Sequence, residues 1–270
     1  MSILVVQMLP QGIIFGADRN ITVTRVASDS SGRSVTFVLG QSQRPKVLRW
    51  PNKKALIGYV GVAEVGGIPT DEWLYEYIGN HLEFPSFETL AYDLTETIQE
   101  QRALDEGQNE PEALVLQLAG FEERDAQQVP VVWYIRNPHG MRDGFYTDIR
   151  KEFLCSEEFW KYFPNIPPNQ IRDRLNRLAL DNRPFWFHQG LDLGTFNTLD
   201  RFLRGAFALL CQAHPAHSFP QTLPEWEQHL NMAILTYGAY YQAFREPGEQ
   251  YVGGGADTVS LIWPEPGAIT

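Results

Sequence analysis

The sequence predicts a four-layer αββα sandwich, an α+β fold in which two antiparallel sheets are flanked by pairs of helices. Short strand-like runs separated by turn residues fill the first 60 residues and return later in the chain. Two pairs of amphipathic helix patterns interrupt these runs. Because sheets and amphipathic helices must each bury an apolar face, two stacked sheets with a helix pair on each outer face would cover all of them.

The opening of the chain is expected to be a meander of strands. Apolar runs alternate with turn residues, and the runs lie at residues 2–9, 12–18, 21–26, 34–39 and 54–60. Short connections at residues 10–12 and 28–32, rich in Pro, Gly, Ser and Asp, suit antiparallel hairpins.

The first helix pair follows. Thr70 is a hydroxyl N-cap candidate, and the two acidic residues after it favour a helix N-terminus. One face of this helix is apolar, with Trp73, Leu74, Tyr77, Ile78 and Leu82. The second helix begins near Ser86 and has its own apolar stripe, with Phe87, Leu90, Ala91, Leu94 and Ile98. A polar tract over residues 99–112 is expected to end it as an exposed loop.

Strand patterns return in the rest of the chain, at residues 113–121, 129–135, 144–149, 184–188 and 258–263. A turn is expected at residues 137–140, and a helix at 171–180 lies within an otherwise irregular stretch. The second helix pair precedes the last strand, with stripes at Leu199, Phe202, Leu203, Ala206, Leu209 and Leu210, and at Trp226, Leu230, Ala233, Ile234, Tyr237, Tyr241 and Phe244. No long linker divides these elements, so we expect one domain over residues 1–270.

Composition excludes several classes of protein. With 22 Lys and Arg against 33 Asp and Glu, the net charge of −11 argues against a nucleic-acid partner, whose phosphates are held mainly by basic residues. The only cysteines are Cys155 and Cys211, which favours a reducing compartment over a disulfide framework. We find neither an apolar run of about 20 residues nor the features of a secretory signal, so a soluble, cytoplasmic protein without a membrane partner is expected.

The first hairpin carries a more specific pattern. Ser2 leads an apolar strand, and the strand after it reads Gly-Ile-Ile-Phe-Gly-Ala-Asp and ends at Asp18. This arrangement resembles the opening of proteasome β subunits and their bacterial relatives, which are N-terminal nucleophile hydrolases. The spacing from Ser2 to Asp18 also matches that family.

Two later blocks agree with the resemblance. Lys46 begins a Lys-apolar strand, and a strand that ends at Gly61 precedes Glu64, where the family usually has Asp. A Gly-rich turn at residues 253–255 is similar to the turn before the family's late strand. The resemblance covers residues 2–80 well and the helix order over 195–263. No family motif is found between about 100 and 190, which we therefore interpret as an atypical insertion.

The resemblance implies a catalytic site of Ser2, Asp18, Lys46 and Gly61. The Ser2 hydroxyl would attack a peptide or amide carbonyl, and its own α-amine, with a pKa near 7.7–8.0, would accept the proton. Met1 must then be removed. Lys46 would lower the pKa of the nucleophile, Asp18 would pair with Lys46, and the Gly61 N–H would bind the oxyanion. The family's further acidic and Ser partners are not clearly present near Glu249, Gln250 and Gly253.

Simpler interpretations remain for each of these residues. A Ser at position two is common, an Asp before a turn is usually a turn residue, and a lone Lys is usually solvated. Two alternative functions also stay open: a catalytically inactive, structural ring subunit of the same fold, and an amidohydrolase that acts on a small molecule. The leading hypothesis is a threonine-peptidase-type hydrolase with Ser as its nucleophile.

No cofactor or metal is expected. His214, His217 and His229 lack a Cys or carboxylate to complete a zinc ligand set. For assembly, the resemblance implies a homo-oligomer, a ring or a spiral, of at least six subunits. Tyr75 lies off the apolar stripe of its helix, where an interface aromatic would be placed.

Overall fold

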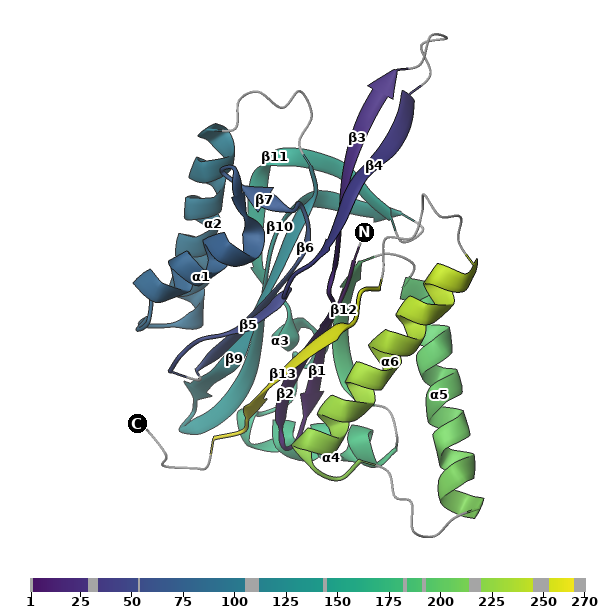
Figure 1. Cartoon of the computed structure of the whole chain (residues 1–270). Helices are drawn as coiled ribbons and strands as arrows, with labels where there is room; N and C mark the ends of the chain where they lie inside the picture. Colours follow the sequence, from purple (N-terminus) through teal and green to yellow (C-terminus); the bar gives the residue numbers. More distant parts are fainter. Residues whose placement is uncertain are drawn as a thin grey trace.

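The computed structural model describes residues 2–28, 34–52, 54–104, 112–142, 145–181, 184–190, 193–213, 220–244 and 253–264. Two large antiparallel sheets form its centre (Figure 1). The four-stranded sheet has the order β12 (Phe185–Gly190), β1 (Ile3–Leu9), β2 (Gly12–Asp18) and β13 (Ala256–Ile262). The five-stranded sheet has the order β11 (Phe145–Glu157), β10 (Gln127–Arg142), β9 (Leu114–Arg124), β6 (Ala55–Gly61) and β5 (Val47–Arg49).

Successive side chains of β1 pack alternately into two separate hydrophobic clusters. Leu4 and Val6 face the five-stranded sheet and pack with residues of β9 and β10, such as Val115 and Val132. Ile3 and Val5 belong to a different cluster on the other face of the sheet. Since successive side chains of a strand point to opposite faces, an unbroken apolar run is the pattern of a strand covered on both sides.

Helices cover the outer faces of these sheets. The helices α1 (Thr70–Asn80) and α2 (Phe87–Leu104) pack on the five-stranded sheet through the predicted apolar stripes, except that Leu82 lies beyond α1 and is 47% exposed. On the four-stranded sheet lies α6 (Leu223–Phe244), with α5 (Leu193–Ala213) beside it (Figure 1). Gly16 lets α6 approach closely, because a Cβ there would lie 2.6 Å from Ile234 Cδ1 and 2.9 Å from Leu230 Cδ2.

The prediction of a four-layer αββα sandwich built from two sheets is wrong. The described strands form four separate antiparallel sheets, since β3 (Asn20–Ser28) and β4 (Ser34–Gln43) make a ribbon of their own, and β7 (Glu64–Val65) and β8 (Ile68–Pro69) make another. Figure 1 shows the β3–β4 ribbon extending away from the large sheets. A register shift between Val23 and Thr24 accompanies this departure, and such bulges bend and twist a strand pair.

The stretch before β12 contains helices as well. The helix α4 (Ile171–Leu180) confirms the helix predicted at 171–180, whereas α3 (Phe159–Tyr162) and the short helix η1 (Pro168–Gln170) between them were not predicted. Phe159 and Ile171 are fully buried in the same cluster as Leu4, Phe15 and Val132. The core between the large sheets is therefore completed by helical residues, because the sheets alone leave apolar side chains at one end uncovered.

The turn predicted at residues 137–140 is also wrong, because β10 continues through it. The register of β10 against β11 shifts between Arg136 and Pro138, as a strand with an internal Pro requires. Asn137 compensates for the interrupted ladder. Its Oδ1 accepts from the N–H of Leu114 at 2.7 Å, and its Nδ2 donates to the carbonyls of Glu112 and Arg150 at 2.9 Å each.

The exposed loop predicted at residues 99–112 can be compared with the structure only in part. The polar tract at 99–112 falls partly on α2, which reaches Leu104, and partly on residues outside those described. Among the described helices none is long and apolar enough to span a bilayer.

Truncating Phe159 tests the role of α3 in the core. Phe159→Ala is expected to lower the free energy of unfolding by about 3–5 kcal/mol, because it leaves a cavity between the sheets. Tyr162→Ala is the control, since Tyr162 on the same helix is 61% exposed. Urea unfolding of both variants measures the difference. Equal losses would contradict the placement of α3.

Two histidines, the buried His229 and the partly buried His188, predict a loss of stability in acid. Burial lowers the pKa of His188 and of His229, and Arg204 lowers the latter further. The unfolded chain, with His pKa values near 6.5, therefore takes up protons before the folded chain does. The stabilisation is complete above about pH 6.5 and is lost as the pH falls through the lowered pKa values. Between about pH 7.5 and 5.5, we expect the free energy of unfolding in urea to fall less for His229→Gln than for the wild type. An equal or larger fall in the variant would contradict the role of His229.

Candidate active site

Ser2 stands immediately before β1, at the edge of the core between the large sheets. Its side chain belongs to the same alternating set as Leu4 and Val6, which face the five-stranded sheet. The residue is 7% exposed. Its Oγ accepts a hydrogen bond of 2.7 Å from the Nζ of Lys46. This hydroxyl is therefore already oriented by a cation in the described structure.

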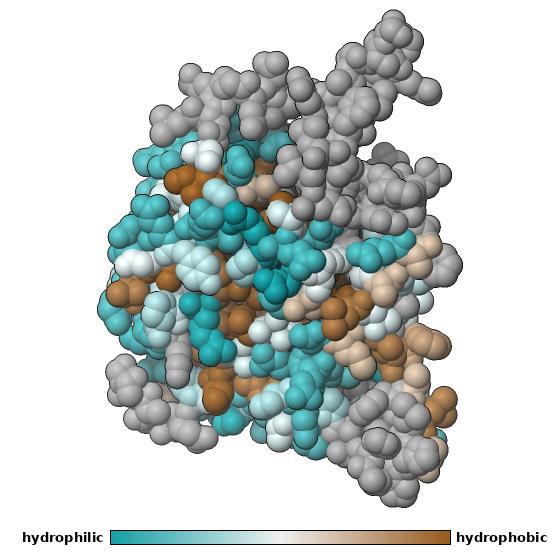
Figure 2. All heavy atoms as spheres, viewed as in Figure 1, coloured by the Kyte–Doolittle hydropathy of each residue, from teal (hydrophilic) through white to brown (hydrophobic). Residues whose placement is uncertain are grey.

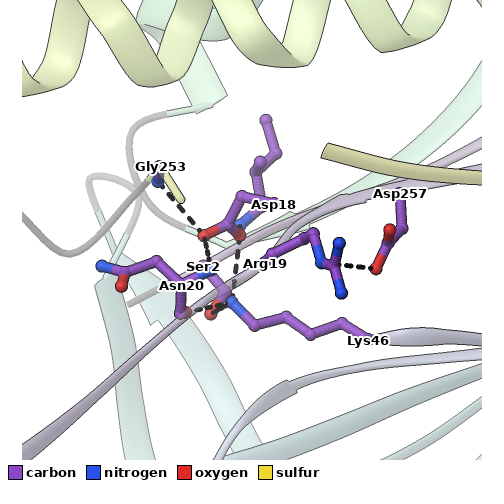
Figure 3. A network of polar contacts seen from close by, with 8 residues as sticks. Ser2, Asp18, Arg19, Asn20, Lys46, Gly253 and Asp257 are labelled. Atoms are coloured by element: carbon purple, nitrogen blue, oxygen red, sulfur yellow. Dashed lines mark hydrogen bonds and ion pairs between the residues drawn. The ribbon is translucent and has the colours of Figure 1, made fainter. Parts of the chain in front are cut away.

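Lys46 stands just before β5 and is 1% exposed. All of its donor capacity is used within the site. Besides Ser2, its Nζ donates to Oδ1 of Asp18 at 3.2 Å and to the backbone carbonyl of Asn20 (Figure 3). An ammonium group has three N–H donors, so these three acceptors satisfy it completely.

Asp18 ends β2 and is 1% exposed. Its Oδ1 accepts from the N–H of Ile3 at 2.8 Å as well as from Lys46. Its Oδ2 accepts from the N–H groups of Asn20 at 3.2 Å and of Gly253 at 3.3 Å. The carboxylate thus joins the start of β1, the end of β2 and the segment that leads into β13.

Burial controls the protonation of this pair. It raises the pKa of the Asp18 carboxyl, against the opposing effects of Lys46 and the backbone donors. It lowers the pKa of the Lys46 amine, against the attraction of Asp18. Both shifts follow from the cost of a charge in a low-dielectric interior.

The structure brings Ser2, Asp18 and Lys46 into hydrogen-bonding contact. Gly61 is the fourth residue expected at the site. Gly61 ends β6 opposite Leu114, and its φ is +117°. A Cβ at this position would lie 2.0 Å from the carbonyl oxygen of Ala113, so glycine is required for strand pairing. No hydrogen bond joins Gly61 to Ser2, Asp18 or Lys46 among the described contacts. Its part in binding an oxyanion stays a prediction.

The late loop contributes a backbone group where the resemblance implied side chains. Glu249 and Gln250 lie outside the described residues, whereas Gly253 places its N–H on Asp18 and its carbonyl on the N–H of Asn20, at 3.0 Å. Gly253 has a φ of +142°, which favours glycine. A main-chain donor leaves little signal in a sequence beyond the glycine itself.

A second ion pair beside the site was not predicted. Asp257, in β13, has its Oδ2 3.4 Å from Nε of Arg19. Burial raises the pKa of Asp257, while Arg19 and then Lys46 oppose this effect. The register places Asp257 opposite Ala17, one residue before Asp18. Only this pairing of the last strand with β2 reveals the neighbourhood, since 239 residues separate Asp257 from Asp18 along the chain.

The segment that carries Lys46 is also fastened to a helix. Nη1 of Arg44 contacts Oδ1 of Asp71 at 3.1 Å and Oε1 of Glu72 at 2.7 Å, both in the first turn of α1. The backbone N–H of Arg44 donates to the carbonyl of Arg19 at 3.0 Å. The acidic residues that the sequence marked as a helix start therefore have a second role, because they hold the chain two residues before Lys46.

No family model matches the chain, and no curated protein matches it. Among solved structures, Anbu (ancestral beta-subunit) from Yersinia bercovieri has 10% identity and a TM-score of 0.43, with 96% of this chain and 81% of that chain covered. An Anbu (Gly-1) mutant from Hyphomicrobium sp. strain MC1 has 12% identity and a TM-score of 0.45, with 98% and 84% covered.

These matches correct the family expected from the sequence. The prediction of a proteasome β-subunit-like family member is wrong as stated, because the matched structures are ancestral beta-subunit proteins, a proteasome-like but distinct family. At these identities and TM-scores the similarity assigns no activity to this chain.

Removing the buried cation tests the electrostatics of the site. Lys46→Met is expected to lower the free energy of unfolding by about 3–5 kcal/mol, because Asp18 is left as a buried charge without a partner. Lys54→Met is the control, since the Lys54 side chain is 46% exposed in its pair with Glu83 and surface substitutions usually change stability by about 0.5 kcal/mol or less. Chemical unfolding at neutral pH measures both. A loss in Lys46→Met no larger than that in the control would contradict the buried pair.

Proposed function

We propose that the protein is an N-terminal nucleophile hydrolase that cleaves peptide or amide bonds with Ser2. The observation that carries the proposal is the 2.7 Å hydrogen bond from the buried Lys46 amine to the Ser2 hydroxyl. Asp18 and the Asn20 carbonyl hold that amine in place. A positioned cation that contacts a hydroxyl is a recognised way to activate a weak nucleophile.

The proposed reaction uses Ser2 twice. Its Oγ forms a bond to the substrate carbonyl carbon, and the proton of the hydroxyl passes to the α-amine that removal of Met1 exposes. Collapse of the tetrahedral intermediate breaks the amide bond, and the leaving amine takes that proton. Water then hydrolyses the ester on Ser2 with the α-amine again as base. Lys46 stabilises the developing alkoxide, and the Gly61 N–H remains the proposed donor to the oxyanion.

The nature of the nucleophile bears on the rate. Ser lacks the γ-methyl group that restricts χ1 in Thr, so the Ser2 hydroxyl depends more on Lys46 for its orientation. We therefore propose modest turnover. The cytoplasm is the proposed compartment, which accords with a free thiol at Cys155.

One observation favours the alternative of a structural subunit without catalysis. Ser2 is only 7% exposed in the chain that retains Met1, whereas a nucleophile has to be reached by its substrate. The third possibility, a small-molecule amidohydrolase, fits the same observation, because a small amide needs less open space than a peptide. Peptide substrates together with small amides separate these alternatives.

Turnover by the mature chain tests the proposal. Intact mass first establishes that Met1 has been removed. A panel of fluorogenic peptides and small amides is then offered to the wild type and to Ser2→Ala, with Ser260→Ala, a serine of β13, as the control. We expect Ser2→Ala to lose at least 100-fold in kcat/KM and the control to stay near the wild type. Equal turnover by wild type and Ser2→Ala, or none by the mature wild type, would refute the hydrolase.

We also propose that the chain assembles into a homo-oligomer, a ring or a spiral, of at least six subunits. Tyr75 on α1 supports this, because it is 56% exposed and exposed aromatics are enriched at interfaces. The chemistry at Ser2 and the assembly are separate parts of the proposal, so either one can fail alone.

A further inference from the structure

Polar side chains interrupt the apolar layer between the two large sheets. Figure 2 shows hydrophilic side chains over much of the surface in view, where water satisfies their polar groups. The layer between the sheets is built instead from apolar residues such as Leu4 and Val6. Gln117, Tyr134 and Gln189 are nevertheless buried there. Burial of a polar group is costly unless the group is hydrogen-bonded, so these side chains require an explanation.

Strand pairing brings the three side chains together. Gln117 in β9 lies opposite Tyr134 in β10, and side chains directly opposite one another share a face of the sheet. The Tyr134 ring reaches the other sheet, since its centre is 6.0 Å from that of Phe187 in β12. Burial raises the pKa of the Tyr134 hydroxyl, while the amides of Gln189 and then Gln117 oppose this effect. The hydroxyl therefore lies beside both amides.

Gln117 keeps unused hydrogen-bonding capacity. The side chain is 0% exposed, yet neither its Oε1 nor its Nε2 has a hydrogen-bond partner among the described residues. A Gln amide offers two N–H donors and one acceptor oxygen. A buried amide of this kind marks a place where a polar group from outside the chain completes the contacts.

Arg136 adds a charge to this group. It follows Tyr134 by two residues in β10, so both side chains lie on the same face of the strand. Its Cζ is 5.9 Å from the centre of the Tyr134 ring. Its Nε is buried and has no hydrogen-bond partner in the described part of the chain. Leu154, opposite Arg136 in β11, is 45% exposed, so this end of the layer meets water.

The polar cluster formed by Gln117, Tyr134, Arg136 and Gln189 lies at the end of the sheets where Ser2 stands. Gln189 is opposite Leu4 in the pairing of β12 with β1. Since Ser2 precedes Leu4 by two residues, Ser2 and Gln189 are diagonal neighbours, a relation in which the residues lie about 7–8 Å apart.

The five-stranded sheet gives the same placement for Arg136. Arg136 is opposite Val115 in β9, which is opposite Val60 in β6. The residue before Val60, Tyr59, donates its N–H to the carbonyl of Lys46. Three strand spacings of about 4.8 Å therefore separate Arg136 from Lys46, roughly 14 Å between their backbones. An extended substrate of about four residues covers that distance.

We propose that the polar cluster binds a carboxylate of the substrate, with Arg136 as its ion partner and the Gln117 amide as a further donor. The planar set of N–H donors on a guanidinium matches the two oxygens of a carboxylate. An ammonium group would be repelled by Arg136, and a carboxamide would leave the guanidinium charge without a counterion. The inference rests on the proposed function and names its substrate class: peptides or amides with an acidic group near the bond that Ser2 attacks.

Matched peptides test this preference in turnover. In the fluorogenic set, Glu occupies each of the four residues before the cleaved bond in turn, and a second set has Gln at the same positions. We expect the best Glu peptide to exceed its Gln counterpart by at least tenfold in kcat/KM for the wild type. Arg136→Gln should remove the difference and Arg136→Lys should keep part of it. Arg150→Gln is the control, because the Arg150 side chain is 52% exposed in its pair with Asp148.

A binding measurement separates this site from the hydrolase. Isothermal titration calorimetry follows the same Glu and Gln peptides on mature Ser2→Ala and on Ser2→Ala/Arg136→Gln. We expect the Glu peptide to bind Ser2→Ala at least tenfold more tightly than the Gln peptide, and the double variant to bind both equally. Binding of this kind without turnover by the wild type would refute the hydrolase and support the carboxylate site.

The remaining outcomes overturn the inference. Equal binding of Glu and Gln peptides to Ser2→Ala, as expected if Gln117 holds only an ordered water, would refute the carboxylate site even where turnover supports the hydrolase. A Glu preference that survives Arg136→Gln, or that Arg150→Gln removes equally, would also refute it. Circular dichroism reports folding. If Arg136→Gln unfolds, Gln117→Leu replaces it, with an expected loss of at least threefold in the preference for Glu.

Discussion

The buried ion pair between Asp18 and Lys46 is the interaction on which the rest of the structure depends. The two side chains are 1% and 2% exposed, and burial of two charges is costly unless every donor and acceptor is satisfied. Here the backbone N–H groups of Ile3, Asn20 and Gly253 complete the carboxylate. Four distant parts of the chain must therefore meet at this point before the free-energy cost of burying the two charges is offset.

The sheets provide the rigid surroundings that this pair needs. Asp18 is placed by the pairing of β2 with β1 and β13, and Lys46 is placed by the antiparallel pairing of β5 with β6. Helical residues such as Phe159 close the apolar core between the two large sheets. The polar groups at the edge of this apolar core bond to one another, and the Ser2 hydroxyl accepts a hydrogen bond from Lys46.

The site around Ser2 lies on one face of the four-stranded sheet, and α6 covers the other face (Figure 1). Leu230 and Ile234 of α6 pack against Gly16 in β2, the strand that ends at Asp18. The helix therefore supports the strand that positions the carboxylate.

The sequence by itself determined the local elements and the three side chains of the site. Short unbroken apolar runs located β1, β2, β6 and β9, and stripes with helical period located α1, α2, α5 and α6, because these patterns depend only on neighbours along the chain. Ser2, Asp18 and Lys46 were found through a resemblance in residue type and spacing. Their convergence at hydrogen-bonding distance belongs to the structure.

Tertiary structure alone decided the number of sheets, the path of β10 and the outer partners of the site. The ribbon of β3 and β4 forms a sheet of its own, and β10 continues past Pro138, where the Asn137 side chain accepts from the N–H of Leu114. The donors from Gly253 and the pairing of Asp257 with Arg19 involve main-chain groups or residues more than 200 positions apart. Such contacts follow from how sheets close in space, and no local pattern encodes them.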